Sequence, residues 1–214
     1  MAMQILLACV ISVLIGALPF GLWVGLLKGV DIRTLGSKNI GATNVLRVLG
    51  PAAGLIVFAL DTVKGAAGIL LAVVLLLPGL DFPWRVLIGF CAVLGHTFSP
   101  FLRFKGGKGV ATTLGVLLAL SWPVGLIALG VWMLVVLLSR YVSLASIAAG
   151  LSLPIASWFV MPAPDRGWMV GLTVVITALV IIKHRDNLAR LLAGTEAKFG
   201  QRVAAPTEET GHDA

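Results

Sequence analysis

The sequence has 214 residues, of which 59% are hydrophobic and only 12% charged, and its mean hydropathy is +1.05. This composition excludes an ordinary soluble domain and indicates a protein with several membrane-spanning segments. The formal net charge of +7 is explained by basic loops beside a membrane, or by an anionic lipid or substrate, without a nucleic-acid partner.

The apolar runs predict an all-α membrane protein, a bundle of seven transmembrane helices. A helix that crosses a bilayer needs roughly 20 apolar residues at a rise of about 1.5 Å per residue. The first run has no basic segment before it and no clear cleavage site, so we expect a retained helix and not a signal peptide. The expected spans are 4–27, 51–77, 85–99, 110–121, 124–139, 142–161 and 167–183.

Region 110–139 decides the predicted topology, because it is too long for one helix and short for two. Two crossings with Pro123 near the turn place the basic segments 28–50, 99–109 and 183–202 on one side of the membrane. Thirteen of the 16 lysines and arginines then fall on that side, which the positive-inside rule identifies as the cytoplasm. We therefore expect the N-terminus outside and the C-terminus in the cytoplasm.

The loop after the first span is rich in small and polar residues, among them Ser37, Asn39, Thr43 and Asn44. Two amides and two hydroxyls so close together would suit a backbone wrapped around a polar ligand. The alternative is a capped interfacial turn, with Ser37 or Thr43 at a helix N-terminus. Arg47 is a candidate phosphate clamp, because a guanidinium can contact two oxygens at once.

The second span contains two ionisable residues, Asp61 and Lys64, at i and i+3. Both should face inward and pair, either as part of a functional site or as a structural ion pair that joins helices. Cys9 and Cys91 lie in apolar runs, where we expect them to be small buried hydrophobes. No disulfide or metal framework is indicated.

A basic, glycine-rich stretch follows the third span, from Gly95 to Gly109. Gly106, Gly107 and Gly109 let backbone N–H groups approach an anion. The positive charges come from Arg103, Lys105 and Lys108. A helix expected from Val110 would turn its N-terminus toward the same anion. The spacing is not that of a Walker A loop, and a positively charged turn between membrane helices remains the alternative to a phosphate site.

Two further polar segments lie on the same predicted side. In the turn Arg140–Ile147, the hydroxyls, Ser143 among them, could cap a helix or reach a ligand. In Lys183–Glu196, a helix continues out of the last span and places His184 and Asn187 on one face. His184 is a candidate base there. We expect Glu196 to hold the segment through a cap or an ion pair.

Three of these segments closely resemble the cytoplasmic motifs of the bacterial acyl-phosphate:glycerol-3-phosphate acyltransferases, the PlsY family. The resemblance covers about residues 3–202. Lys38 departs from it, because the family usually has glycine there. The matching segments are Ser37-Lys38-Asn39-Ile40-Gly41-Ala42-Thr43-Asn44, then Gly95-His96 with Lys105-Gly106-Gly107-Lys108-Gly109-Val110-Ala111-Thr112, and finally Lys183-His184-Arg185-Asp186-Asn187 with Arg190-Leu191 and Gly194 to Glu196.

The resemblance implies an enzyme that transfers a fatty acyl group from acyl phosphate, and not from a thioester donor, to the 1-position of glycerol 3-phosphate. The products are lysophosphatidic acid and phosphate, in the first acylation step of phospholipid synthesis. The resemblance places the chain in the bacterial inner membrane, with the site on the cytoplasmic side. It implies a single membrane domain over 1–202, which could work as a monomer, and we expect a disordered polar tail over 203–214.

The resemblance also implies roles for individual residues, with no metal and no cofactor. Ser37, Lys108 and His184 are expected to be catalytic. The expected substrate and phosphate contacts are Arg47, Asn39, Asn44, Gly106, Gly107, Gly109, Asn187 and Ser143. The substrate hydroxyl would attack the acyl carbonyl directly, with either His184 or a phosphate oxygen of a substrate as the base. We prefer the phosphate oxygen.

The reaction agrees with the chemistry of the sequence. Two phosphate dianions need two anion sites, the acyl tail needs an apolar groove, and a mixed anhydride needs positioning more than a strong nucleophile. The His-x4-Asp pair of thioester-using acyltransferases is absent, since Phe101 and Ala189 stand five positions after His96 and His184. A transporter for a phosphorylated metabolite is the second hypothesis, which the lack of repeated motifs disfavours. Another enzyme of lipid headgroup chemistry is the third hypothesis. The alcohol phosphotransferases need a cluster of carboxylates to bind metal, and the sequence shows no such cluster.

Overall fold

In a computed structural model, residues 1–201 of the chain are described and form an all-helical bundle. The predicted all-α class is confirmed, since this part contains no β-strand. The expected polar tail over 203–214 and the basic residue Arg202 lie outside the described residues. The helices are α1 (Ala2–Ala17), α2 (Phe20–Leu27), α3 (Ala42–Leu49), α4 (Pro51–Leu71), α5 (Phe82–Thr97), α6 (Val110–Leu120), α7 (Trp122–Ser139), α8 (Val142–Val160), α9 (Ala163–Lys183) and α10 (Arg185–Leu192), with a π-helical turn, Ala72–Leu76, after α4 and a 3₁₀ turn, Pro100–Leu102, after α5.

Six helical segments in the described chain are long and apolar enough to cross a membrane. They coincide with six of the seven expected spans. The seventh, expected over 110–121, coincides with α6, which has 11 residues and is about 16 Å long at 1.5 Å per residue. A bilayer core is about 30 Å thick, so α6 is a half-length helix. The spans are Ala2–Leu27, Pro51–Leu76, Phe82–Leu102, Trp122–Ser139, Val142–Val160 and Ala163–Lys183.

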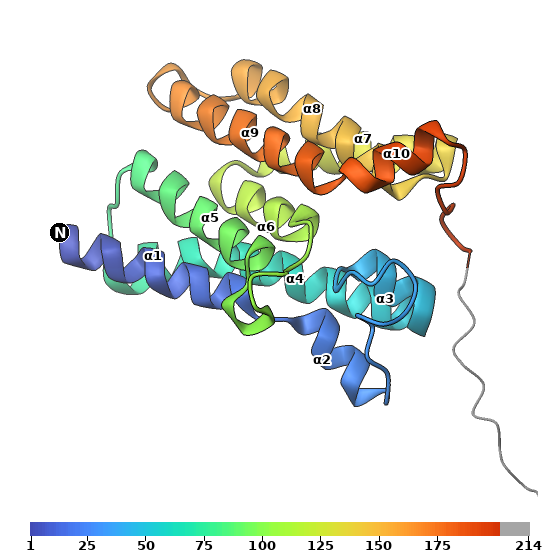
Figure 1. Ribbon diagram of the computed structural model, residues 1–214. Helices are drawn as coiled ribbons and strands as arrows, with labels where there is room; N and C mark the ends of the chain where they lie inside the picture. Colours follow the sequence, from blue (N-terminus) through green and yellow to red (C-terminus); the bar gives the residue numbers. More distant parts are fainter. Residues whose placement is uncertain (202–214) are drawn as a thin grey trace, which may run out of the picture.

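The first span is broken in its middle, where we expected one helix over 4–27. The helix α1 ends at Ala17 and α2 begins at Phe20. Pro19 lacks an N–H group and disfavours helical backbone at the residue before it, and Leu18 accordingly has an extended conformation, φ −56° and ψ 121°. The break turns α2 away from the axis of α1 (Figure 1).

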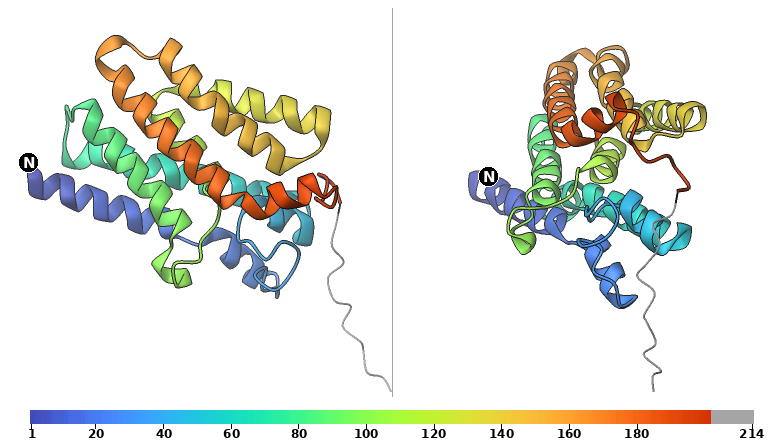
Figure 2. Two further views of the ribbon diagram at one scale, coloured as in Figure 1. Left: turned by 45° about the horizontal axis from the view of Figure 1, so that its top comes forward. Right: turned by 45° about the vertical axis from the view of Figure 1, so that its right-hand side comes forward.

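The long helices form two groups, which are joined by α6 and by a direct contact between α5 and α9. The helices α1, α4 and α5 pack together in one group, and α7, α8 and α9 in the other, while α6 contacts α4, α5 and α7. Figures 1 and 2 show α6 between the two groups, with α3 beside α4 and α10 continuing beyond α9. The N-terminus lies at the end of the bundle opposite to α3 and α10.

Glycines allow α4 and α6 to approach each other closely. A methyl group added to Gly115 would lie 1.8 Å from the carbonyl oxygen of Thr62, and one added to Gly65 would lie 2.1 Å from the carbonyl oxygen of Thr112. No side chain larger than hydrogen fits between the two backbones, a packing mode common among membrane helices. This contact fixes the position of α6, whose N-terminus reaches the functional site.

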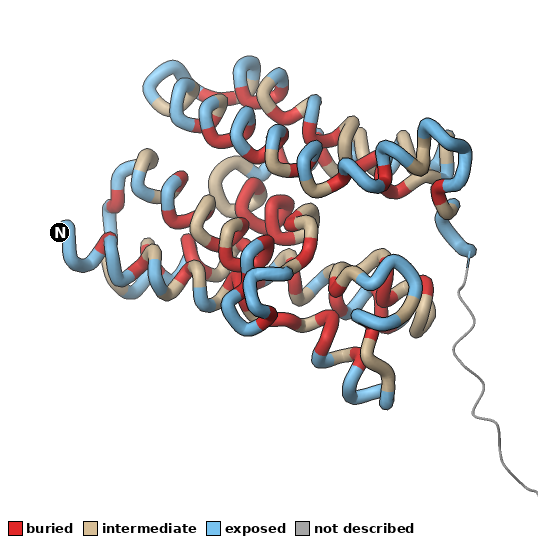
Figure 3. Tube along the Cα trace, viewed as in Figure 1, coloured by how far each residue is buried: buried red, intermediate tan, exposed pale blue. Residues whose placement is uncertain are grey.

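The outer surface of the bundle is apolar. Figure 3 shows buried residues between the helices and exposed residues on the outer faces. Many of the exposed residues are large and hydrophobic, such as Leu137, Leu138 and Phe159. Such a surface would be an aggregation hazard in water, but it suits contact with lipid acyl chains.

Candidate functional site

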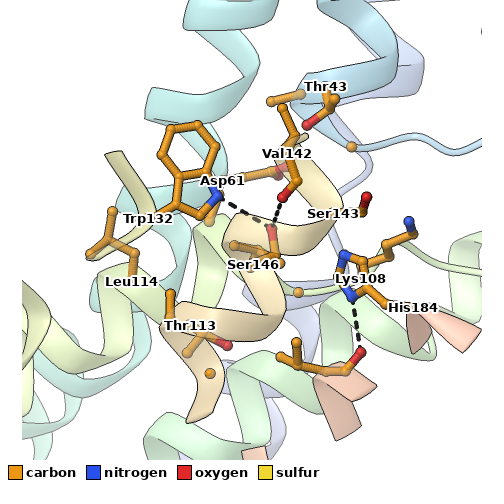
Figure 4. Close-up of a pocket in the computed structure, with 18 of the residues that line it drawn as sticks. Thr43, Asp61, Lys108, Thr113, Leu114, Trp132, Val142, Ser143, Ser146 and His184 are labelled. Carbon is orange, nitrogen blue, oxygen red and sulfur yellow. Dashed lines mark hydrogen bonds between the residues drawn. The ribbon is translucent and has the colours of Figure 1, made fainter. Parts of the chain in front are cut away.

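A cavity with about 1160 Å³ of empty space, part of it open to solvent, brings the separated sequence motifs together. Its walls come from helices of both groups, from α6, and from the segments that precede α3 and follow α10. Figure 4 shows Lys108, His184 and Ser143 on one side of the cavity and Trp132 and Leu114 on the other. The cavity therefore has a polar end and an apolar end.

The loop before α3 reaches the polar end, and Asn44 holds it in shape. The side-chain oxygen of Asn44 accepts a hydrogen bond from the Ser37 N–H (2.8 Å). Its amide nitrogen donates to the carbonyl oxygens of Ile32 (3.0 Å) and Leu35 (3.1 Å). Since these bonds engage both ends of the buried amide, Asn44 organises the loop, and Ser37 lines the cavity beside it.

Two further residues of this motif line the cavity, Asn39 and Arg47. The side-chain oxygen of Asn39 accepts a hydrogen bond from the Gly41 N–H (2.9 Å). Arg47 is 8% exposed, and its Nη2 donates to the carbonyl oxygen of Ala197 (3.1 Å). Its Nε has no partner among residues 1–201. Burial lowers the pKa of Arg47 and the Glu196 carboxylate opposes that shift, but a guanidinium stays charged and can offer this donor to an anion.

The glycine-rich stretch leads directly into α6, which begins at Val110 as predicted. Gly109 stands just before the helix with φ +79°, a conformation that favours glycine. The first N–H groups of α6 have no partner within the helix, and the residues Val110 and Ala111 line the cavity. A helix N-terminus placed in this way favours an anion.

Lys108 supplies positive charge to the cavity from the same stretch. Its Nζ donates a hydrogen bond to the side-chain oxygen of Asn187, on α10. Burial is the main reason why the pKa of Lys108 is lowered to about 8; Glu196 and Asp186 raise it, whereas Arg190 and Arg47 lower it further. A bound dianion would favour the charged ammonium.

His184 stands at a kink between α9 and α10, where we expected an uninterrupted helix. It is 3% exposed, and its Nδ1 lies 2.9 Å from the carbonyl oxygen of Val180. A carbonyl only accepts, so Nδ1 carries the proton and Nε2 is left as an acceptor in the neutral ring. Burial, and then the charge of Lys108, lower the pKa of His184 to about 4. The ring is therefore neutral at pH 7.

Glu196 links the segment after α10 to both α8 and α10 at the polar end. It forms an ion pair with Arg190, as we expected, and two further hydrogen bonds. Its Oε1 accepts hydrogen bonds from Ser143 Oγ on α8 (2.8 Å) and Asn187 Nδ2 on α10 (2.6 Å), and its Oε2 accepts one from Arg190 Nε (2.7 Å). Burial raises the pKa of Glu196, but these hydrogen bonds outweigh it and lower the pKa overall. The carboxylate thus also holds Asn187, which accepts the hydrogen bond from Lys108.

The other end of the cavity is apolar and lies among the long helices. Leu117 of α6, Ala128 of α7 and Leu153 of α8 form its walls. Trp132 contributes its ring, while its Nε1 donates to Ser146 Oγ at 3.2 Å. With its polar atom satisfied in this way, Trp132 presents an apolar surface to the cavity.

Most of the predicted site residues meet in this one cavity. Gly106 and Gly107 do not line it, because they pack against His96 behind Lys108. Glu196, Thr113 and Asp61 do line it, although they were not among the predicted ligands. The predicted residues that line the cavity are Ser37, Asn39, Asn44, Arg47, Lys108, Gly109, Ser143, His184 and Asn187.

The chain matches a family model described as glycerol-3-phosphate acyltransferase over residues 6–194. The glycerol-3-phosphate acyltransferase of Fusobacterium nucleatum is 46% identical over 191 residues, which cover 89% of this chain and 95% of that protein. Glycerol-3-phosphate acyltransferase 1 of Deinococcus radiodurans is 43% identical over 204 residues, with 95% of this chain and 100% of that protein covered.

Solved structures agree with these sequence matches. The crystal structure of PlsY (YgiH), an integral membrane glycerol 3-phosphate acyltransferase, in its glycerol 3-phosphate form is 44% identical, with a TM-score of 0.83 over 92% of this chain and 96% of that chain. The lysophosphatidic acid form of that protein has a TM-score of 0.81 with the same identity and coverage.

Proposed function

The chain belongs to the glycerol-3-phosphate acyltransferase family, and we propose that it transfers a fatty acyl group from acyl phosphate to the 1-position of glycerol 3-phosphate. The products would be lysophosphatidic acid and inorganic phosphate, in the first acylation step of bacterial phospholipid synthesis. That the chain is an integral membrane enzyme of this family follows from the matches. The acyl phosphate donor is the part that needs support from the site.

The observation that carries the proposal is the joining of a cationic end and an apolar end in one cavity. The anionic phosphates of the two substrates would lie at the end that holds Arg47, Lys108 and the N-terminus of α6. The acyl chain would lie among Leu117, Ala128 and Leu153. The scissile bond of an acyl phosphate joins these two kinds of group, so it would stand where the polar and apolar surfaces meet.

The reaction needs no covalent enzyme intermediate. The 1-hydroxyl oxygen of glycerol 3-phosphate attacks the acyl carbonyl carbon, and the tetrahedral intermediate expels inorganic phosphate as the carbon–oxygen bond to phosphate breaks. The hydroxyl proton passes to a phosphate oxygen. Lys108, Arg47 and Ser37 would stabilise the negative charge that develops on the leaving phosphate, and preorganised donors of this kind supply much of the catalysis in acyl transfer.

His184 would orient the attacking hydroxyl. Its Nδ1–H is engaged by Val180, so Nε2 can accept a hydrogen bond from the hydroxyl. A pKa of about 4 makes His184 a weak base at neutral pH, which favours a phosphate oxygen as proton acceptor. Asn187, Asn39 and Ser143 would bind the glycerol end and its phosphate, while Asn44 would shape the loop beneath them.

The membrane topology that we propose has seven crossings, with the N-terminus outside and this cavity at the cytoplasmic face of a bacterial inner membrane. The distribution of lysines and arginines supports this orientation. So do the opposite positions of the N-terminus and α10 in the bundle (Figure 1). We propose one membrane domain over 1–202 with a polar tail over 203–214, active as a monomer without metal or cofactor.

The decisive experiment is to measure phosphate release from acyl phosphate by the purified protein in lipid. Reactions would be run with and without glycerol 3-phosphate, with EDTA, and with acyl-CoA replacing acyl phosphate in a parallel reaction. We expect release that requires glycerol 3-phosphate, survives EDTA and yields lysophosphatidic acid, and no transfer from acyl-CoA. Transfer from acyl-CoA without transfer from acyl phosphate would contradict the proposed donor.

His184→Gln separates the two candidate bases. If a phosphate oxygen accepts the proton, this variant should retain part of its activity, because glutamine can still accept a hydrogen bond from the hydroxyl. A loss of rate as severe as that of Lys108→Ala, with glycerol 3-phosphate binding intact, would instead make His184 the general base.

A further inference from the structure

An ionic cluster is buried in α4 close to the cavity. Lys64 Nζ lies 2.7 Å from Asp61 Oδ1, and each side chain is only 3% exposed. Charged groups within a membrane domain are costly, so each of them requires a reason to be there. The surroundings of the two residues give different reasons for Lys64 and for Asp61.

Lys64 has a structural task at the break of the first span. Its Nζ donates a hydrogen bond to the carbonyl oxygen of Leu18 (2.7 Å) and lies 5.4 Å from the centre of the Phe20 ring. The last carbonyl groups of α1 have no partner within that helix, and a cation at a helix C-terminus is favourable. Lys64 therefore stabilises the end of α1, and Asp61 balances its charge.

His96, at the end of α5, lies between Asp61 and the glycine-rich loop. It is 4% exposed, and its Nδ1 is 3.9 Å from Asp61 Oδ1, with no hydrogen-bond partner in the described part of the chain. The opposite edge of the ring faces Gly107, where an added methyl group would lie 2.2 Å from His96 Nε2. The Gly107 N–H also donates to the His96 carbonyl oxygen (3.2 Å).

Through this contact, His96 supports the backbone that precedes Lys108. A methyl group on Gly106 would lie 1.9 Å from the His96 carbonyl oxygen, so both glycines rest directly on this one residue. Lys108 follows immediately and projects into the cavity, where its Nζ contacts Asn187. A change in the orientation of the imidazole would therefore move the loop and the ammonium group together.

We propose that His96 is a positioning residue. Asp61 orients its ring, and the ring holds the Gly106–Gly107 backbone in the position that places Lys108 in the anion site. Nδ1 lies 3.9 Å from the Asp61 carboxylate, beyond hydrogen-bond distance. A proton on Nδ1 would be attracted to that carboxylate, and this attraction would orient the ring. Gly107 packs against the Nε2 edge, and His96 also lines the cavity. The role that we propose for His96 acts through the loop and not on the substrate. This inference rests on the proposed function of the same site.

A double-mutant cycle with Lys108 tests this role. His96→Phe keeps a ring against Gly107 but cannot be oriented by Asp61, and Lys108→Met removes the ammonium group. We expect His96→Phe to affect the same kinetic parameter, KM or kcat, as Lys108→Met. The change caused by His96→Phe should be about tenfold, within the range found for coupled neighbours. In the Lys108→Met background His96→Phe should change that parameter by no more than about twofold.

The matched control is Ser12→Ala. Ser12 is buried on α1, and its Oγ donates to the carbonyl oxygen of Ile88 (2.7 Å) on α5, the helix that also carries His96. Ser12 does not touch the loop. Its effect should multiply with that of Lys108→Met, as expected for independent sites. If His96→Phe also multiplies with Lys108→Met, His96 is only part of the packing and the proposal is wrong.

A second variant and a second measurement keep the test decisive. His96→Asn retains an N–H donor that can face Asp61, so it should recover part of the loss seen in His96→Phe, and it replaces His96→Phe in the cycle if that variant does not fold. Binding of inorganic phosphate, measured by calorimetry, reads the loop without any turnover. If wild-type protein binds phosphate but transfers no acyl group, the proposed function fails, while the same cycle in phosphate affinity still supports or overturns the role of His96.

Discussion

Lys108 connects the electrostatics of the cavity to a measurable pH dependence. Its pKa is lowered to about 8, chiefly by burial, so in the free enzyme the ammonium loses its proton as the pH rises through this value. The fold favours the neutral amine relative to the unfolded chain, and the stability that this gives is present above the unfolded pKa and lost as the pH falls toward 8. A bound phosphate dianion offsets that cost.

We therefore expect kcat/KM to fall about tenfold per pH unit above pH 8, because kcat/KM reports the ionisation of the free enzyme. Lys108→Arg should have lower activity but no such fall, since a guanidinium stays charged. Lys105→Arg is the control and should retain the wild-type profile. A fall above pH 8 that persists in Lys108→Arg would assign the titration to another group.

Any decrease of kcat/KM at acidic pH should not come from protonation of His184. With a pKa of about 4, this ring is already neutral at pH 5. A fall in kcat/KM near pH 6 would instead report the second ionisation of a substrate phosphate, whose pKa is about 6.

Lys38 is a further residue whose conformation leads to a prediction. It has φ +58°, in the left-handed region where a side chain costs about 1–2 kcal/mol. Glycine, the residue that the resemblance led us to expect, avoids this strain at an entropic cost of about 0.5–1 kcal/mol. Lys38→Gly should therefore raise the free energy of unfolding by up to about 1 kcal/mol.

Thermal unfolding in detergent would measure the effect of Lys38→Gly. Lys28→Gly is the comparison, because Lys28 is also exposed but has φ −100°. Its replacement relieves no strain, so it should leave the melting temperature unchanged or lower it. Equal decreases in both variants would show that the left-handed backbone of Lys38 carries no strain.

At the level of single residues, the sequence allowed us to predict which polar groups gather, but not how each one is used. The resemblance and the shared side of the membrane predicted that Ser37, Lys108 and His184 would meet. Whether the Asn44 amide binds a ligand or its own loop depends on backbone geometry that no spacing gives. Glu196 was underestimated for a similar reason, since its contact with Ser143 on α8 requires a chain reversal after α10.

At the scale of elements, the close contact between α4 and α6 determines where the proposed anion site lies. In Gly115→Ala, the added methyl group would meet the Thr62 carbonyl oxygen, and backbone cannot give way as a flexible side chain can. We expect a loss of about 1–3 kcal/mol in stability, typical of overpacking. A fall in kcat/KM should accompany it, because α6 carries the segment that includes Lys108.

Gly130→Ala is the matched control for this prediction. Gly130 lies inside α7, and nothing stands within 4 Å of an added methyl group. The higher helix propensity of alanine should leave the melting temperature of this variant unchanged or slightly raised. If the two variants unfold at the same temperature, close packing of α4 on α6 does not limit stability.

Hydropathy and helix-breaking residues predicted most of the helices, with two exceptions. The end of α6 at Leu120 follows from Ser121-Trp122-Pro123, where the apolar pattern stops and proline begins a new helix. The break at Pro19 was hidden because apolar residues continue on both sides of it. The kink at His184 has no breaker residue, and it depends on packing that hydropathy does not describe.

At the scale of the whole molecule, the half-length helix α6 makes the number of crossings a testable property. If α6 and α7 cross as a pair, five crossings separate Asp81 from Lys198, and the two residues lie on opposite sides. If α6 only enters the membrane and returns, four crossings separate them and they lie on the same side. Both residues are exposed.

Cysteine labelling would distinguish these arrangements. In a background with Cys9→Ala and Cys91→Ala, Asp81→Cys and Lys198→Cys would be treated with a membrane-impermeant thiol reagent in intact spheroplasts and in inverted vesicles. We expect Asp81→Cys to react in spheroplasts and Lys198→Cys only in inverted vesicles. Reaction of both in the same preparation would rule out the seven-crossing topology.

The pairing of Asp61 with Lys64 has a consequence for biogenesis. The two residues are three positions apart in one helix and 2.7 Å from each other, so their charges can be balanced before any other helix is present. A lone aspartate or lysine at the centre of a span costs about 2.5–3.5 kcal/mol at the translocon. The second span can thus enter the bilayer as a nearly neutral segment and recruit α1 later, when the ammonium meets the Leu18 carbonyl oxygen at the end of that helix.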